Sequence, residues 1–337
     1  TTRIHVFIST GSGTGRAQSV WTGLLRPLLT HFGLEELRHY RVHFTTSETS
    51  VAEWTTKWIL PLAQSISSPL VILLSGDGGV VDMINALTSP PTPFTPPEIA
   101  LVPVGTGNAL ATSTGIEKLG SSLRTLLYGT PRPLPIFRTT FSPNARLLSD
   151  HGRTHTPFPT TPPTLHGAVV FSWALHAAIV ADSDTPVLRA HGPARFQHAA
   201  QQALLPTPHP YRGTVSFRPP DTTHWHVIPR DAHGYILAAL VRALEPGFTI
   251  NPAASRAGMP PQPPLRLVHF GPLDAGATAE LLRLAYAEGA HVRDERVGYE
   301  DVGAVRVVMT AGEEERWRRV CVDGRIVVLE EGGWVEV

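Results

Sequence analysis

The sequence predicts an α/β fold class, with a Rossmann-like parallel α/β domain followed by a mainly β domain. Three observations support this prediction. Strand-like and helix-like segments alternate from Ile4 to Phe137, short strand candidates dominate after Pro131, and 337 residues is an ordinary length for two domains. Apolar residues make up 42% of the chain, which is enough to fill two cores.

The first half contains four strand candidates, each followed by a glycine-rich or polar turn and then by a helical pattern. This alternation is typical of a parallel sheet with helices on both faces. The candidates are residues 4–9, 40–46, 70–76 and 99–105.

The second half contains short strand candidates and two helical patterns, near residues 189–205 and 276–288. The change of pattern predicts domains at residues 1–133 and 134–337. Proline-rich segments at 88–97, 142–164 and 251–264 are interpreted as loop insertions, because proline disrupts helices and central strands. The strand candidates are residues 135–141, 167–173, 213–219, 234–240, 265–270, 304–309, 318–324 and 325–330.

Charge and cysteine content narrow the function classes. The chain has 28 basic and 28 acidic side chains, so no basic excess favours a nucleic-acid partner. Lys57 and Lys118 are the only lysines, which makes arginine the expected side-chain ligand for phosphate. Cys321 is the single cysteine, which favours a reducing, cytoplasmic compartment. The sequence shows no transmembrane pattern, the longest nearly apolar run being residues 167–181.

Three strand-to-helix turns in the first half are rich in glycine: GSGTGRA at 11–17, SGDGG at 75–79 and VGTGNALA at 104–111. They are expected at the carboxyl ends of strands of one sheet, where open α/β folds bind ligands. Glycine lets the backbone approach a ligand, and helix N-termini direct amides at anions, so phosphate is the expected ligand.

Other interpretations of these turns are weaker. Any single turn could be only a tight connection. A nicotinamide-dinucleotide fold is disfavoured because Arg16 replaces the last glycine of G-x-G-x-x-G and the second strand ends in Thr45-Thr46 instead of an acid. The P-loop pattern G-x-x-x-x-G-K-[ST] does not occur.

With these motifs assembled, the sequence resembles the diacylglycerol kinase catalytic-domain superfamily, and within it the sphingosine kinases. SGDG followed by INAL at 84–87 resembles the nucleotide signature of the family, and VPVGTGNALATS at 102–113 resembles its second glycine block. The resemblance continues through SWALHAAIVADSD (172–184), LRAHGPARF (188–196), YRGTVSF (211–217) and VDG (322–324). It implies a C-terminal antiparallel β-sandwich domain that holds a lipid, with ATP in the cleft between the domains and Mg²⁺ as the accompanying metal.

Asp77 is the candidate general base, because its turn would hold a carboxylate near an attacking hydroxyl and the resemblance implies the same role. As a plain helix cap it would contribute only about 1 kcal/mol of stability. The resemblance implies ATP contacts from Ser12, Gly13, Gly15, Thr46, Gly76, Gly78, Gly105, Thr106, Gly107, Asn108, Arg189, Arg195, Asp323 and Gly324. Arg189 and Arg195 could otherwise be solvated helix charges.

The resemblance also places Asp182 at the lipid headgroup, with Asp184 in support, and a sphingoid ammonium could pair with such a carboxylate. Either acid could instead be an ordinary loop residue. The expected activity is phosphorylation of the primary hydroxyl of a sphingoid base. Diacylglycerol or ceramide kinase activity, or an inactive lipid- or nucleotide-binding homologue, are the alternatives. Transient docking of the second domain on a membrane surface is expected, while the oligomeric state and the metal ligands stay open.

Several positions depart from the family pattern. Ser9-Thr10 replaces Asn-Pro before the first glycine turn, and Thr14 replaces a lysine within it. Asp82 is shorter than the usual acid of the following helix, and Arg325 stands where a glutamate is typical. These changes concern nucleotide contacts and leave Asp77 unchanged.

Overall fold

A computed structural model describes residues 3–65, 68–88, 93–149, 152–192, 194–254 and 263–337. The chain divides into two compact units, Thr1–Pro133 and Leu134–Val337. Parts of the three proline-rich segments, at 89–92, 150–151 and 255–262, lie outside the described residues, as does residue 193.

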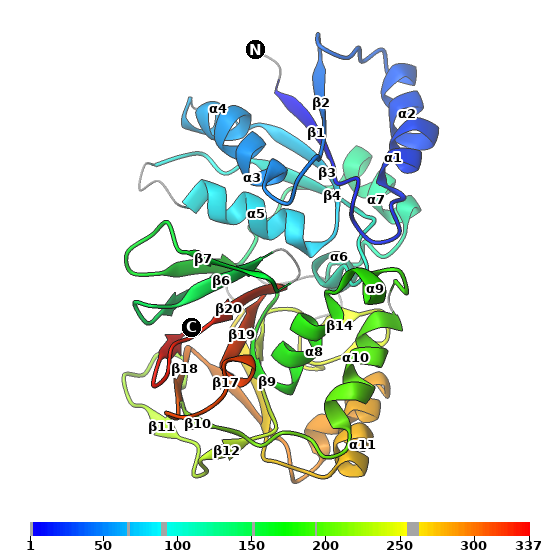
Figure 1. The fold of residues 1–337 in the computed structure, drawn as a ribbon. Helices are drawn as coiled ribbons and strands as arrows, with labels where there is room; N and C mark the ends of the chain where they lie inside the picture. Colours follow the sequence, from blue (N-terminus) through cyan, green and yellow to red (C-terminus); the bar gives the residue numbers. More distant parts are fainter. Residues whose placement is uncertain (1–2, 66–67, 89–92, 150–151, 193, 255–262) are drawn as a thin grey trace. The chain divides into compact units, whose positions relative to one another are not determined.

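The first unit is built on a parallel four-stranded sheet with the strand order β2-β1-β3-β4 (Figure 1). The central strand β3 is an apolar run, LVILLS, that is buried on both faces, as parallel sheets require. The strand order reverses between β1 and β3, which is the switch point where such sheets bind ligands. The strands are β1 (Ile4–Ile8), β2 (Tyr40–Phe44), β3 (Leu70–Ser75) and β4 (Glu98–Pro103).

Helical segments cover both faces of this sheet, with α1, α2 and α7 on one side and α3, α4 and α5 on the other (Figure 1). Alternate strand residues such as Val6, Ile8 and Ile72 pack with Trp21 and Leu25 in one core cluster. The segments are α1 (Ala17–Val20), η1 (Trp21–Leu25), α2 (Arg26–His31), α3 (Ser50–Trp54), η2 (Thr55–Ile59), α4 (Leu60–Gln64), α5 (Asp77–Thr88), α6 (Ala109–Ser113) and α7 (Leu119–Tyr128).

The second unit contains two large antiparallel sheets. One has the order β11-β10-β18-β21-β5-β8, with β12 paired to β10, and the other has the order β17-β16-β13-β9-β19-β20-β6-β7. Residues of both sheets, including Phe141, Trp173 and Val307, share one buried cluster. The predicted fold class, a parallel α/β domain followed by an antiparallel β domain, is thus confirmed.

Each of the eight predicted strand candidates overlaps a strand of the second unit. The strands are β5 (Phe137–Phe141), β6 (Arg146–Ser149), β7 (Thr154–Pro157), β8 (Thr164–Gly167), β9 (Val170–Ala174), β10 (Tyr211–Arg218), β11 (His226–Val227), β12 (Ala232–His233), β13 (Tyr235–Ala239), β14 (Ala243–Glu245), β15 (Phe248–Thr249), β16 (Leu265–Phe270), β17 (Gly298–Val302), β18 (Ala304–Met309), β19 (Arg319–Val322), β20 (Arg325–Val328) and β21 (Trp334–Glu336).

Two sequence expectations for this unit were wrong. The segment 142–164 is more than a loop insertion, because β6 and β7 extend a sheet from β20; its prolines lie outside β6, and Pro157 ends the edge strand β7, which tolerates it. The alternative that Asp182 is an ordinary loop residue is also wrong, because Asp182 lies in the helix α8 (Leu175–Ser183). Its alanine-rich sequence favours a helix.

The helices of the second unit are α8 (Leu175–Ser183), α9 (Pro186–Arg189), α10 (Ala194–Leu204) and α11 (Ala275–Tyr286), with short turns η3 (Ala290–Arg293) and η4 (Glu315–Trp317). The predicted helical regions near 189–205 and 276–288 correspond to α9–α10 and α11. Within the described ranges, none of the helices has both the length and the apolar character needed to cross a bilayer.

Candidate active site

The glycine-rich turns after β1 and β3 are joined by buried hydroxyl groups. The Ser9 hydroxyl donates to Ser75 Oγ at 2.9 Å, and Ser12 Oγ lies 3.4 Å from the same oxygen. Neither Ser9 nor Ser75 was predicted as a site residue. These contacts hold the two turns together at the switch point of the sheet.

Backbone contact brings the third turn against the other two. A Cβ atom added to Gly105 would lie 2.4 Å from the Cα of Gly76, and one added to Gly13 would lie 2.4 Å from the carbonyl oxygen of Val104. Gly13 also has φ +56°, a conformation that favours glycine. The three predicted turns therefore meet at the carboxyl edge of the sheet with bare backbone facing bare backbone.

Asn108 closes the third turn. Its Oδ1 accepts a hydrogen bond from the Gly105 amide at 3.0 Å, and its Nδ2 donates to the Gly105 carbonyl at 2.8 Å. Its backbone is left-handed, with φ 47°, which asparagine tolerates better than most residues. Asn108 thereby shapes the turn from which α6 begins.

Asp77 links the second turn to the third. Its Oδ2 accepts from the Ala109 amide at 2.7 Å and its Oδ1 accepts from the Leu110 amide at 3.0 Å, so the carboxylate caps α6. Burial raises the pKa of Asp77, and the hydrogen bonds from Leu110 and Ala109 partly offset this effect. One carboxylate is thus held in a fixed position among the three turns, with a pKa shifted toward that of a useful base.

The other expected residues of the first unit lie in the same turns or beside them. Gly15 has φ +74° in an exposed part of the first turn, and Gly78, Thr106 and Gly107 are partly or fully exposed. Thr46 is also exposed, and its amide donates to Ser50 Oγ at 3.1 Å. Its neighbour Thr45 makes the contact with the first turn, because Thr45 Oγ1 accepts from the Thr10 amide at 2.9 Å.

In the second unit, Asp184 forms ion pairs with both arginines that the sequence analysis expected to contact ATP. Arg189 donates through Nε at 2.7 Å and Nη2 at 3.1 Å, and Arg195 donates through Nη1 at 3.3 Å. Two guanidinium groups share one carboxylate, so the cluster keeps a net positive charge. It can orient arginines toward an anion, and Asp184 positions them.

Asp182 is also paired, with two arginines that sequence reasoning missed. Arg319 Nη1 lies 3.1 Å from Asp182 Oδ1, and Arg316 Nη2 lies 3.4 Å from Oδ2. Asp182 is on the last turn of α8, while its partners are more than 130 residues later in the chain. No local motif could reveal a pairing that only the tertiary fold creates.

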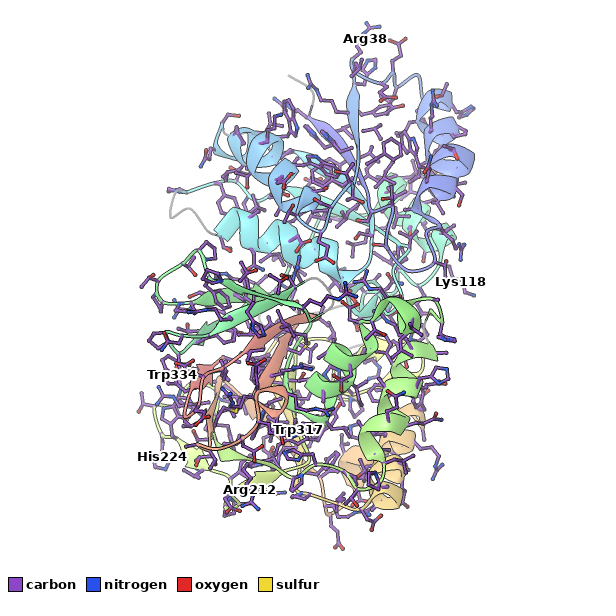
Figure 2. All side chains as sticks on the ribbon, in the orientation of Figure 1. Arg38, Lys118, Arg212, His224, Trp317 and Trp334 are labelled. Carbon is purple, nitrogen blue, oxygen red and sulfur yellow. The ribbon has the colours of Figure 1, made fainter. Side chains whose placement is uncertain are left out.

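Asp182 and Arg316 line a pocket of about 400 Å³ within the second unit. Trp317 also lines it and is labelled in Figure 2. The remaining wall is largely apolar or proline-rich and includes Ala178, Ala203 and Leu205. This volume lies within the range of small-molecule pockets, and the lining includes a few polar groups.

Asp323 has a structural role that the sequence did not reveal. It is buried, and its carboxylate accepts hydrogen bonds from the amides of Ala168, Val169 and Val170 at 2.5 to 3.1 Å. These bonds hold the carboxylate within the second unit, and its expected contact with the nucleotide stays a prediction. Gly324 follows it in an exposed turn with φ +87°.

Among the described residues, no group of three or more histidine, cysteine, aspartate or glutamate side chains is arranged to hold a metal ion. Mg²⁺ commonly binds through one or two carboxylates together with substrate phosphates. The site accordingly offers glycine backbone for phosphate groups and one partly buried carboxylate, Asp77.

Comparisons with known proteins agree with this architecture. Residues 3–139 match the diacylglycerol kinase catalytic domain. No curated protein matches the chain significantly.

The chain is similar in fold to the crystal structure of a diacylglycerol kinase from Bacillus anthracis str. Sterne, with a TM-score of 0.56, 12% identity, and coverage of 99% of this chain and 93% of that one. Two structures of candidate diacylglycerol kinases from the same organism also have TM-scores of 0.56, at 10% and 13% identity. They cover 98% and 99% of this chain and 94% of theirs. Residues 3–139 therefore match the diacylglycerol kinase catalytic domain, and the chain shares its fold with these structures.

Proposed function

We propose that this protein is an ATP- and Mg²⁺-dependent lipid kinase that phosphorylates the primary hydroxyl of a sphingoid base. The observation that carries the proposal is the meeting of three glycine-rich turns around the Asp77 carboxylate, at the carboxyl edge of one parallel sheet. The matched catalytic domain supports the kinase chemistry. The sphingoid preference rests on the motif at 172–184.

A phosphate site at these turns is part of the proposal, because Gly13, Gly76 and Gly105 let the three turns pack backbone against backbone at the sheet edge where such folds bind ligands. We assign the nucleotide to these turns, with Ser12, Gly15, Thr46, Gly78, Thr106, Gly107, Asn108 and Gly324 as further contacts. Arg189 and Arg195 would neutralise phosphate charge, because Asp184 already fixes their guanidinium groups.

Asp77 would accept the proton of the lipid hydroxyl as that oxygen attacks the γ-phosphate. The Ala109 and Leu110 amides hold both of its oxygens, which fixes the carboxylate for this role. When bound, Mg²⁺ would offset the charge on the phosphates. We assign no metal ligand beyond the phosphates themselves.

A neutral lipid is the second candidate substrate, and one observation favours it. Asp182, the proposed partner of the sphingoid ammonium, is already paired with Arg316 and Arg319. Diacylglycerol and ceramide carry no ammonium group and need no free carboxylate. Membrane docking by the second unit and a cytoplasmic location remain part of the proposal.

Kinase assays on sphingosine, ceramide and diacylglycerol with labelled ATP, in the presence of Mg²⁺ or of excess chelator, test the proposal. We expect transfer to sphingosine, its loss with chelator, and a loss of about 10²- to 10⁴-fold in kcat for Asp77→Asn. Asn keeps the shape of the side chain and can still accept one amide hydrogen bond, so folding can be checked by circular dichroism.

Asp221→Asn is the control, because Asp221 is exposed in a loop of the second unit. A folded Asp77→Asn variant with the activity of this control would disprove the base assignment. Transfer to diacylglycerol or ceramide alone would replace the sphingoid proposal with the second candidate. Wild-type protein that transfers phosphate to none of the three lipids would contradict the proposed function.

A further inference from the structure

The environment of Asp182 differs on its two sides. Arg319 contacts Oδ1, lies on β19 and has a side chain that is 21% exposed, whereas Arg316 contacts Oδ2 from the turn η4 and is 50% exposed. Arg316 lines the pocket that Asp182 also lines. The first pair is anchored in the sheet, and the second faces the pocket.

Besides its ion pair with Asp182, Arg316 contacts the ring of Trp317. Its Cζ lies 4.1 Å from the centre of the Trp317 ring, a distance that allows a cation–π contact. Trp317 is itself held in place, because the His209 ring stacks on it with centroids 4.0 Å apart and the Tyr211 ring meets it edge-on at 5.5 Å. The guanidinium could therefore leave Asp182 and still keep a favourable contact.

The ion pair of Asp182 with Arg316 is also longer than its ion pair with Arg319. The contact between Arg316 and Asp182 is 3.4 Å and half-exposed, and such ion pairs contribute little stability. Asp182 remains partly exposed, at 33% of its side chain. A ligand cation in the pocket could take the place of Arg316 with little energetic cost.

We propose that Arg316 is a specificity-determining residue, a built-in counter-ion of Asp182 that competes with the ammonium group of a lipid. This inference rests on the proposed lipid kinase function. An ammonium-bearing lipid must displace Arg316 from Asp182, whereas a neutral headgroup enters the pocket without breaking the pair. Arg316 thus lowers the preference for sphingoid bases relative to neutral lipids.

The test compares Arg316→Gln with wild-type protein for binding of radiolabelled sphingosine and of diacylglycerol in detergent micelles, and for kcat/KM on both lipids. Gln removes the positive charge, so the ratio of sphingosine to diacylglycerol affinity should rise about two- to fivefold, as loss of one exposed ion pair allows. Arg316→Lys should restore most of the wild-type ratio, because it keeps the charge.

Arg306→Gln is a matched control. Arg306 is 49% exposed and pairs with Glu336 at 2.6 Å, but it lies on β18 next to Trp334, which lies apart from Trp317 in Figure 2. This variant should leave the lipid ratio unchanged. An unchanged ratio in a folded Arg316→Gln variant, or the same change in Arg306→Gln, would overturn the inference.

The lipid-binding measurement distinguishes a failure of this inference from a failure of the proposed kinase function. If the wild-type protein lacks kinase activity but Arg316→Gln shifts the binding ratio, the kinase proposal fails and the role of Arg316 stands. If phosphate transfer occurs with an unchanged ratio in both measurements, the kinase proposal stands and the role of Arg316 fails.

Discussion

A single buried carboxylate, Asp323, organises one edge of the second unit. Its backbone is left-handed, with φ 48°, and its oxygens accept amide hydrogen bonds from the two residues before β9 and from Val170, the first residue of that strand. Hydrogen bonds to a charged group are stronger than neutral ones, and a buried amide without a partner is costly. Asp323 therefore fixes how β9 begins.

Asp323→Asn should lower the free energy of unfolding by about 2 to 3 kcal/mol, because an amide cannot accept all of these bonds and its NH₂ group would face other donors. Urea unfolding of the full chain measures the change. Asp221→Asn is a close match, because Asp221 also has positive φ, at 59°, but is exposed. Equal stability of the two variants would refute the structural role.

The three glycine-rich turns depend on one another for their shape, because their backbones pack closely together. Gly76 and Gly105 approach so closely that neither can carry a side chain without movement of the other turn. Gly78, in the same motif as Gly76, has open space around its Cβ position. The sequence alone makes all of these glycines look equivalent.

Gly105→Ala should destabilise the protein by about 1 to 3 kcal/mol, because the new methyl group overlaps Gly76 and Asn108 Oδ1 and forces the turns apart. Gly78→Ala should leave stability unchanged or raise it by up to about 1 kcal/mol, since Gly78 is helical. Thermal unfolding of both variants checks this difference. A Gly105→Ala variant as stable as Gly78→Ala would show that the turns do not pack as described.

Across the whole molecule, burial keeps several histidines neutral. It lowers the pKa of His43, in the first unit, to about 4, and His5 and nearby cations add to this effect. It also lowers the pKa of His176, in the second unit, to about 4. His43 lies against His5 and Trp54, and His176 Nδ1 lies 2.7 Å from Ser172 Oγ.

These histidines should make the protein sensitive to acid. Their pKa is lower in the folded than in the unfolded chain, so their stabilising contribution is fully present above about pH 6.5 and is lost as pH falls toward 4. The slope is at most about 1.4 kcal/mol per pH unit for each histidine. Calorimetry from pH 7.5 to 4.5 should show a smaller loss for His43→Gln and His176→Gln than for wild type. Parallel curves for all three proteins would contradict this assignment.

The sequence by itself determined the α/β and β fold classes, the strands of the parallel sheet and the three glycine-rich turns. It could do so because apolar runs, glycines and helix patterns are local signals. It also singled out Asp77, whose motif lies within one strand-to-helix connection.

Only the tertiary structure decided the partners of the charged groups. Asp77 caps a helix more than 30 residues away, Asp323 binds amides about 150 residues earlier, and Asp182 meets Arg316 and Arg319. The sequence also did not predict that the residues of α8 form a helix, or that β6 and β7 join a sheet. Ion pairs and sheet edges depend on which distant segments become neighbours, and a linear motif carries no information about that proximity.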